Sequence, residues 1–230
     1  MPAKKVEVAE IGTVSLYKRR NARSIKITIL PSGGVRVTMP NWLPYRSGIE
    51  YAKSKVDWIK QHQTVQVKLL QGKRVGKYHR LVFQTAATET IKTRVTDSEI
   101  KVIYPVELSV QTEAVQTRAL LACEKALRQE AETLLPQRLD QLASKFGYQY
   151  RSVSIKKLKS RWGSCDHQQR ISLNLYLMLL PWTLIDYVLV HELNHTKHLN
   201  HSRQFWAEIE LHLPGAKNLR RQLRLYQPSL

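Results

Sequence analysis

Apolar and polar residues alternate along much of the first hundred positions, as in strands that bury one face. Two such runs, 25–29 and 35–39, flank Pro31-Ser32-Gly33-Gly34, whose composition is typical of a hairpin turn. Between the alternating stretches, residues 47–62 carry apolar side chains at helical spacing, and Ser47 is a plausible N-cap. The pattern therefore predicts a β-rich N-terminal region with one helix over residues 1–110. Its further strands are expected at 78–83, 91–95 and 100–104.

In the second half of the chain, the apolar residues recur mainly at helical spacing. A helix is predicted from Thr112 towards Phe146, with Gly147 as its stop and with Pro136 either kinking it or beginning a second segment. Short alternating runs follow at 153–155 and 171–177, and no internal repeat is evident. The pattern predicts an α+β fold, in which a domain of helices packed on a small sheet spans residues 111–230. Its later helices are expected to begin near Pro181 and to cover Ser202–Leu213 and Ala216–Tyr226.

The most chemically specific pattern is His191-Glu192-Leu193-Asn194-His195, which reads H-E-x-x-H. Residues four apart on a helix share one face, so both imidazoles could reach one zinc ion at about 2.0–2.1 Å. Glu192 would then lie beside the metal, where a carboxylate can accept a proton from water. Two histidines that are merely hydrogen-bonded are the alternative. The apolar sequence before the motif and the polar sequence after it favour zinc.

A catalytic zinc ion usually has three protein ligands and one open position. His198 shares the helical face, but a rise of about 1.5 Å per residue places it some 10 Å from His191 along the axis. A ligand beyond a chain reversal at Asn200 is therefore needed. His201 is favoured, with Glu208 as the main alternative, and His212 is also considered.

Composition restricts the class of protein and its partners. The net charge of +19 is spread over both halves of the chain and predicts a polyanionic partner, either nucleic acid or an acidic protein surface, unless the basic faces are only solvated. Two cysteines form no disulfide framework, and Cys165 is expected to support a turn rather than to bind metal. No apolar leader or membrane-length run is present in the sequence, so a cytoplasmic protein is expected.

Several short segments combine residue types that are unusual outside functional sites. In chain order they are Arg161-Trp162-Gly163-Ser164-Cys165, Ile171-Ser172-Leu173-Asn174, Pro181 with Asp186-Tyr187-Val188, His191-Glu192-Leu193 with His195, and Asn200-His201-Ser202 with Phe205-Trp206. In this order and spacing the chain resembles the YgjP-like metallopeptidase family. A more distant similarity is to SprT-type zinc proteases, which act on proteins bound to DNA. The resemblance covers most of the chain.

The resemblance implies a zincin-like catalytic domain with one Zn²⁺ per chain, bound by His191, His195 and His201, and with Glu192 as general base. The substrate would be a protein or peptide. Arg161 or Tyr187 could stabilise the oxyanion of the reaction, and Asn174 is a further candidate for substrate contact.

The run 171–177 is expected to be a strand, either at an edge, to which an extended peptide could add, or in the core of the sheet. Two other functions remain open. One is a zinc hydrolase that acts on a non-peptide amide. The other is a basic nucleic-acid-associated protein, either a protease of the SprT type or a binding module with an inactive metal site. The oligomeric state is not indicated by the sequence.

Overall fold

A computed structural model describes residues 4–29, 34–62 and 69–230. The chain forms two compact units, Met1–Lys68 and Leu69–Leu230, which are described separately. The sequence analysis placed a boundary after residue 110, whereas the structure includes residues 69–110 in the second unit. The reason is that Leu81 and Ile100 of this β region belong to the same hydrophobic core as Cys123 of the long helix that follows.

The first unit is a four-stranded sheet with two helices. The predicted pairing of runs 25–29 and 35–39 is confirmed, because Ile29 lies opposite Val35 in an antiparallel pair; residues 31–33 of the turn lie outside the described residues. The helical stretch is two helices rather than one, since the first ends at Ser54, whose hydroxyl donates to the carbonyl of Tyr51. The elements are β1 (Lys4–Val8), β2 (Gly12–Arg19), β3 (Lys26–Ile29), β4 (Val35–Pro40), α1 (Tyr45–Lys53) and α2 (Val56–His62), with strand order β1-β2-β4-β3.

The second unit begins with another four-stranded sheet, in the order β5-β6-β8-β7. Its central strands are parallel and its outer pairs antiparallel, as in the first unit, so the two sheets share one strand order and one set of directions. This structural repeat has no visible counterpart in the sequence. The strands are β5 (Arg74–Val75), β6 (His79–Ala86), β7 (Lys92–Val95) and β8 (Glu99–Pro105).

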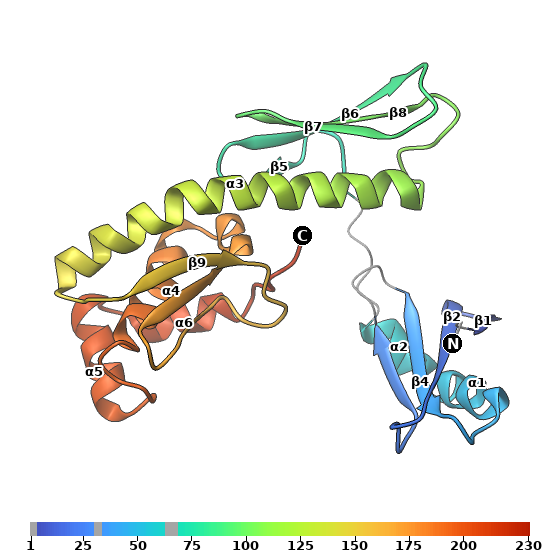
Figure 1. Cartoon of the computed structure of the whole chain (residues 1–230), viewed down its shortest axis with the longest axis horizontal. Helices are drawn as coiled ribbons and strands as arrows, with labels where there is room; N and C mark the ends of the chain where they lie inside the picture. Colours follow the sequence, from blue (N-terminus) through green and yellow to red (C-terminus); the bar gives the residue numbers. More distant parts are fainter. Residues whose placement is uncertain (1–3, 30–33, 63–68) are drawn as a thin grey trace. The chain divides into compact units, whose positions relative to one another are not determined.

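The sheet β5–β8 packs on α3 (Glu113–Phe146), the longest helix of the structure (Figure 1). The helix continues through Pro136 as one element, and the second half of its ribbon is inclined to the first (Figure 1). It ends where predicted, at Gly147, which has a left-handed backbone with φ of 68°. The N-terminal half of α3 contacts the sheet, and the C-terminal half supports the elements that carry the H-E-x-x-H motif.

A three-stranded sheet lies beside the C-terminal half of α3. Its strands are β9 (Ser152–Lys156), β10 (Gly163–Cys165) and β11 (Arg170–Asn174), in the order β10-β11-β9. Of the two positions expected for the run 171–177, the edge is wrong, and the strand is shorter than expected. β11 is the central strand, and it ends at Asn174, whose side chain accepts from the Tyr176 amide and begins a 3₁₀ helix over Leu175–Leu179. The outer strand of this sheet that contacts α4 is β10.

Three helices complete the unit: α4 (Trp182–Asn194), α5 (Arg203–His212) and α6 (Ala216–Leu223). α4 follows Pro181 as expected and is largely buried, while α5 begins at Ser202, whose hydroxyl accepts from the Phe205 amide. No helix in the described part of the chain is long and apolar enough to cross a membrane. The predicted mixed α+β architecture is confirmed.

Candidate metal centre

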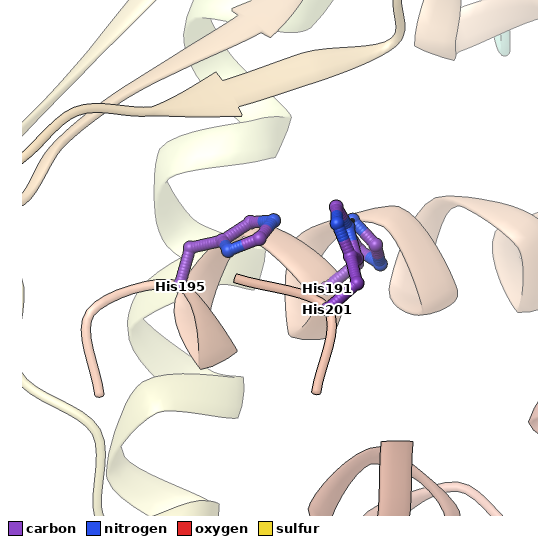
Figure 2. A group of neighbouring side chains, drawn as sticks. All are labelled: His191, His195 and His201. Carbon is purple, nitrogen blue, oxygen red and sulfur yellow. Dashed lines mark hydrogen bonds between the residues drawn. The ribbon is translucent and has the colours of Figure 1, made fainter. Parts of the chain in front are cut away.

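Three imidazoles converge at the end of α4. His191 lies in its last turn, His195 is its C-cap residue, and His201 lies in the link before α5. One nitrogen from each ring lies within 4.8 Å of the other two. Figure 2 shows the ring of His195 facing those of His191 and His201 across a shared space. The H-E-x-x-H spacing and the chain reversal at Asn200 together bring the rings to one point.

The details of these rings fit a metal ion. The Nδ1–H of His195 donates to the carbonyl of His198 at 3.0 Å, which leaves Nε2 with a free lone pair. The Nε2 atoms of His191 and His201 are 3.0 Å apart, close to the roughly 3.3 Å expected of two nitrogens on one tetrahedral zinc ion. The buried Nδ1 of His191 has no hydrogen-bond partner among the described residues. A set of three imidazoles suits zinc and related transition metals.

The surroundings keep two of the three rings in the neutral form that metal binding needs. Burial, together with the charges of His195, His201 and Arg220, lowers the pKa of His191 to about 3. Burial likewise lowers the pKa of His201, with the same sign from His195 and Arg220. Since a metal ligand must offer a lone pair, an imidazole that resists protonation is prepared for coordination.

Glu192 lies on α4 next to the three rings and is buried, with 6% of its surface exposed. Burial raises the pKa of its carboxyl group to about 8, and the positive charge of Arg161 opposes this rise. Its carboxylate faces β10, where Gly163 leaves room for it. A carboxyl group with a pKa near neutrality can both accept and release a proton at physiological pH.

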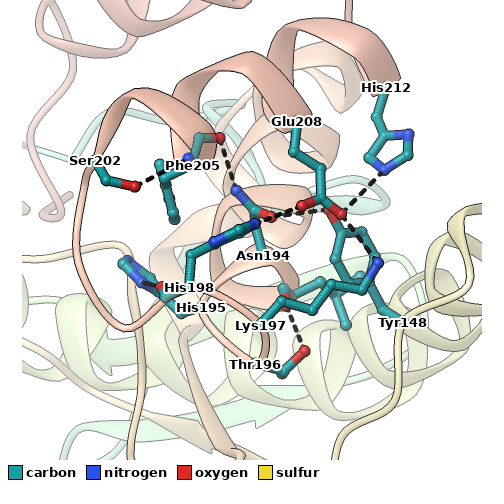
Figure 3. Close-up of polar contacts among 11 residues, drawn as sticks. Tyr148, Asn194, His195, Thr196, Lys197, His198, Ser202, Phe205, Glu208 and His212 are labelled. Carbon is teal, nitrogen blue, oxygen red and sulfur yellow. Dashed lines mark hydrogen bonds and ion pairs between the residues drawn. The ribbon is translucent and has the colours of Figure 1, made fainter.

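The other candidate ligands form a separate network (Figure 3). The carboxylate of Glu208 accepts from His198 Nε2 at 2.6 Å and from Lys197 Nζ at 2.9 Å, with His212 Nε2 at 3.8 Å. These contacts tie the link between α4 and α5 to α5 itself. Because the carbonyl of His198 orients His195, the network also fixes a ring of the cluster. Sequence reasoning missed this role for Glu208, since it depends on contacts between different elements.

A second set of hydrogen bonds supports the end of α4 from within the core. Asn194, at a variable position of the motif, donates from Nδ2 to the carbonyl of Phe205 at 2.8 Å. Its Oδ1 accepts from the hydroxyl of Tyr148 at 3.0 Å. Asn194 therefore joins α4, α5 and the segment after α3, with both the nitrogen and the oxygen of its amide engaged in the fold.

The three candidates for substrate contact occupy different environments. Arg161 is exposed at the start of β10, and its charge acts on Glu192. Tyr187 lies one turn before His191 with ring centroids 6.1 Å apart, and burial raises the pKa of its hydroxyl. Asn174 is buried and donates from Nδ2 to the carbonyls of Leu158 and Arg161, at 2.9 and 2.8 Å. Both donors of Asn174 are thus engaged in holding the loop that carries Arg161.

Two further residues border the cluster: Trp206, which the sequence analysis included in the segment Phe205-Trp206, and Arg220, which it did not anticipate. The indole of Trp206 stacks on the ring of His201, with centroids 5.5 Å apart and planes at 23°. The guanidinium of Arg220, from α6, lies over the same indole at 4.5 Å. The only sequence signal for Arg220 is a run of basic residues in a short helix, which is far less specific than H-E-x-x-H.

Comparisons with known proteins give the following matches. Among solved structures, the metallopeptidase zymogen abylysin of Pyrococcus abyssi is 29% identical with a TM-score of 0.37. The metallopeptidase zymogen jannalysin of Methanocaldococcus jannaschii is 18% identical with a TM-score of 0.36. Each match covers 40% of this chain and 94% of the other. A comparison with curated proteins gave no match.

The family comparison covers far more of the chain. The model described as "YgjP-like, metallopeptidase domain" matches residues 23–226, a range that begins in the first unit and includes every residue of the metal centre. On this match the chain belongs to the YgjP-like family and carries its metallopeptidase domain.

Proposed function

We propose that this metal-dependent peptidase hydrolyses peptide bonds with one zinc ion per chain, held by His191, His195 and His201, and with Glu192 as general base. The observation that carries the proposal is the convergence of three imidazole nitrogens within 4.8 Å of one another beside a buried carboxylate. The choice of zinc rests on the all-imidazole donor set and on the H-E-x-x-H pattern.

A zinc ion in such a site lowers the pKa of a bound water to about 7 and polarises a carbonyl oxygen. Glu192 accepts the proton of the attacking water and delivers it to the leaving amine. Burial raises the pKa of this carboxyl group, so its carboxylate is a stronger base than that of an exposed glutamate, which supports proton uptake from water. Arg161 and Tyr187 are the candidates for donation to the oxyanion.

The substrate peptide would lie along β10. β10 is an outer strand of its sheet, and it contains Gly163, the residue that faces Glu192. A peptide that hydrogen-bonds to β10 as an added strand would therefore run past the proposed general base, Glu192. This placement replaces the edge position considered for run 171–177, which the topology puts in the middle of the sheet.

The test combines metal analysis with a single substitution. Purified protein should contain one zinc ion per chain, and Glu192→Gln should retain the metal while losing hydrolysis of an unstructured protein substrate by at least about a thousandfold. The isosteric amide keeps the shape of the side chain but cannot accept the proton. Wild-type protein without stoichiometric zinc at neutral pH, or full activity in Glu192→Gln, would refute the proposal.

A nucleic-acid-associated function is the second candidate, and one observation favours it. Lys5, Arg19, Lys26 and Arg36 project from the face of the first sheet that α1 and α2 do not cover, and within the described residues none of them has a carboxylate partner. Such a face attracts phosphates. Binding to DNA that falls steeply with salt, and that is lost on replacing Lys26 and Arg36 by Gln, would support this function. If DNA binding is unaffected by salt and by these substitutions, this face of the first sheet is not the site that binds nucleic acid.

A further inference from the structure

Arg220 of α6 lies beside the candidate metal centre, and Arg224, one helical turn later, is the C-cap residue of this helix. Arg220 is held over Trp206, at 4.5 Å from the indole ring, and Trp206 in turn stacks on His201. Trp206 also lies against the ring of His191, with centroids 6.0 Å apart. The guanidinium of Arg220 is therefore linked through one indole to two of the three rings of the cluster.

Neither arginine has an acidic partner within the described residues, although each is exposed. Their neighbour Arg221 differs, since its guanidinium donates to Asn218 Oδ1 at 3.0 Å. The stack on Trp206 restricts the plane of the Arg220 guanidinium while its edge keeps donors free.

The acidic groups near the centre do not neutralise this charge. Glu192 is buried behind Gly163, and Glu208 is already paired with Lys197 and His198. Arg161 adds a third exposed guanidinium, on the side of the centre formed by β10. With a metal cation in place, the rim would be strongly positive and would lack a counter-charge from the protein.

We propose that the preferred substrate carries a carboxylate next to the scissile bond, and that Arg220 binds this carboxylate and so sets the specificity. The inference rests on the proposed peptidase function. An arginine matches a carboxylate with two parallel N–H···O bonds, which gives orientation as well as attraction. The carboxylate can be an acidic side chain or the C-terminus of the substrate, and the two sources are separable by experiment.

The experiment uses the full-length zinc-loaded protein and a set of matched fluorogenic peptides. The peptides differ only in having Glu, Gln or Lys beside the cleaved bond, and each is made with a free and with an amidated C-terminus. Cleavage is measured as kcat and KM separately. Binding of the same peptides to Glu192→Gln is measured by fluorescence anisotropy, which gives a readout independent of catalysis.

Wild-type protein should prefer the Glu peptide over the Gln peptide by about tenfold, mainly in KM and in the dissociation constant. Arg220→Gln should remove the preference, and Arg220→Glu should transfer it to the Lys peptide. Arg221→Gln is the matched control, because it removes the same charge from the same helix at a position away from the centre, and it should behave as the wild type. Zinc content is checked in every variant.

The outcomes separate the inference from the function on which it rests. Equal cleavage and equal binding of the three peptides would overturn the inference and leave the peptidase function intact. A preference that follows the free C-terminus rather than Glu would assign the carboxylate to the end of the chain. If no peptide is cleaved by zinc-loaded protein, the peptidase function fails, and the anisotropy measurements still decide whether Arg220 selects carboxylates.

Discussion

Gly163 and Glu192 approach each other so closely that position 163 cannot carry a side chain without displacing the carboxylate. A Cβ atom placed on Gly163 would lie 2.8 Å from both Cγ and Oε1 of Glu192. The contact joins β10 to α4, and it explains why the turn-and-strand segment Arg161–Cys165 accompanies the H-E-x-x-H helix. The glycine provides the space in which the proposed general base is held.

Gly163→Ala should therefore impair catalysis while leaving metal binding intact. Gly163 is not among the glycines with positive φ, so the alanine backbone is tolerated and the added methyl group acts on Glu192 itself. We expect kcat to fall by roughly ten- to a hundredfold, since displacement of a reacting group by about 1 Å costs about that much. Stoichiometric zinc measured alongside kcat distinguishes this effect from damage to the ligands. Unchanged kcat would mean that Glu192 does not act from its observed position.

The choice of third ligand is tested by two histidine variants. His201→Ala should weaken zinc binding by about a hundredfold or more, because it removes one of the three proposed ligand nitrogens. His198→Ala should have a smaller effect, since the side chain of His198 pairs with Glu208 and only its backbone carbonyl contacts His195. Competition with a chromogenic chelator measures both affinities. The reverse order of effects would move the third ligand to His198.

The parts of this molecule that follow local rules were predictable. Gly147 ends α3 because a left-handed residue closes a helix there, and the spacing of His191 and His195 follows from the helical period. The run 171–177 shows where local rules fail. Its alternation looks like one strand, yet Asn174 caps a 3₁₀ helix, and Leu175 and the three residues after it are all buried. Alternation cannot distinguish a strand from a short, fully buried helix.

Contacts between elements that are far apart along the chain could not be predicted from local sequence patterns. The position of β11 in the middle of its sheet depends on a parallel pairing with β9, which no local signal specifies. The boundary at residue 110 was placed by the change of period, but the side chains of β6 and β8 pack on α3. The position of Arg220 was unpredictable for the same reason, because it depends on a contact with Trp206, which lies on another helix.

A buried carboxylate in the middle of α3 is expected to be critical for stability. Glu130 accepts from the amides of Lys77 and Tyr78 at 2.6 and 3.0 Å, and its Oε1 lies 2.6 Å from Nδ1 of His79. Glu130→Ala leaves these buried groups unpaired and should lower the free energy of unfolding by about 3–5 kcal/mol. Urea denaturation followed by tryptophan fluorescence measures the change.

The control for Glu130 is on the same helix. Glu132 is exposed and pairs only with Arg128, at 3.6 Å, one turn away. Glu132→Ala should change the free energy of unfolding by less than about 1 kcal/mol. Equal effects of the two substitutions would show that the network around Glu130 does not stabilise the fold.

Neither cysteine should react as a thiolate at neutral pH. Burial, together with the charges of Glu192 and Asp166, raises the pKa of the Cys165 thiol to about 11, and burial is the main cause that raises that of Cys123 to about 12. At pH 8 the thiolate fraction of Cys165 is then roughly two-hundredfold below that of an ordinary thiol with a pKa near 8.5. Alkylation by iodoacetamide, followed by mass spectrometry, should be correspondingly slow in the native protein and rapid after unfolding. Rapid native labelling of Cys165 would restore it as a candidate metal ligand.

The same displacement of the Cys123 pKa makes stability depend on pH in the alkaline range. In the unfolded chain this thiol loses its proton near pH 9, whereas in the folded protein it keeps the proton until about pH 12. Between these values the folded state binds more protons than the unfolded state, so the free energy of unfolding falls as the pH rises. The stabilisation is fully present below pH 9. Urea titrations from pH 8 to 10.5 should show this decline, and Cys123→Ala should reduce its slope, because alanine has no proton to lose. An identical slope in both proteins would mean that Cys123 titrates alike in the folded and unfolded chains.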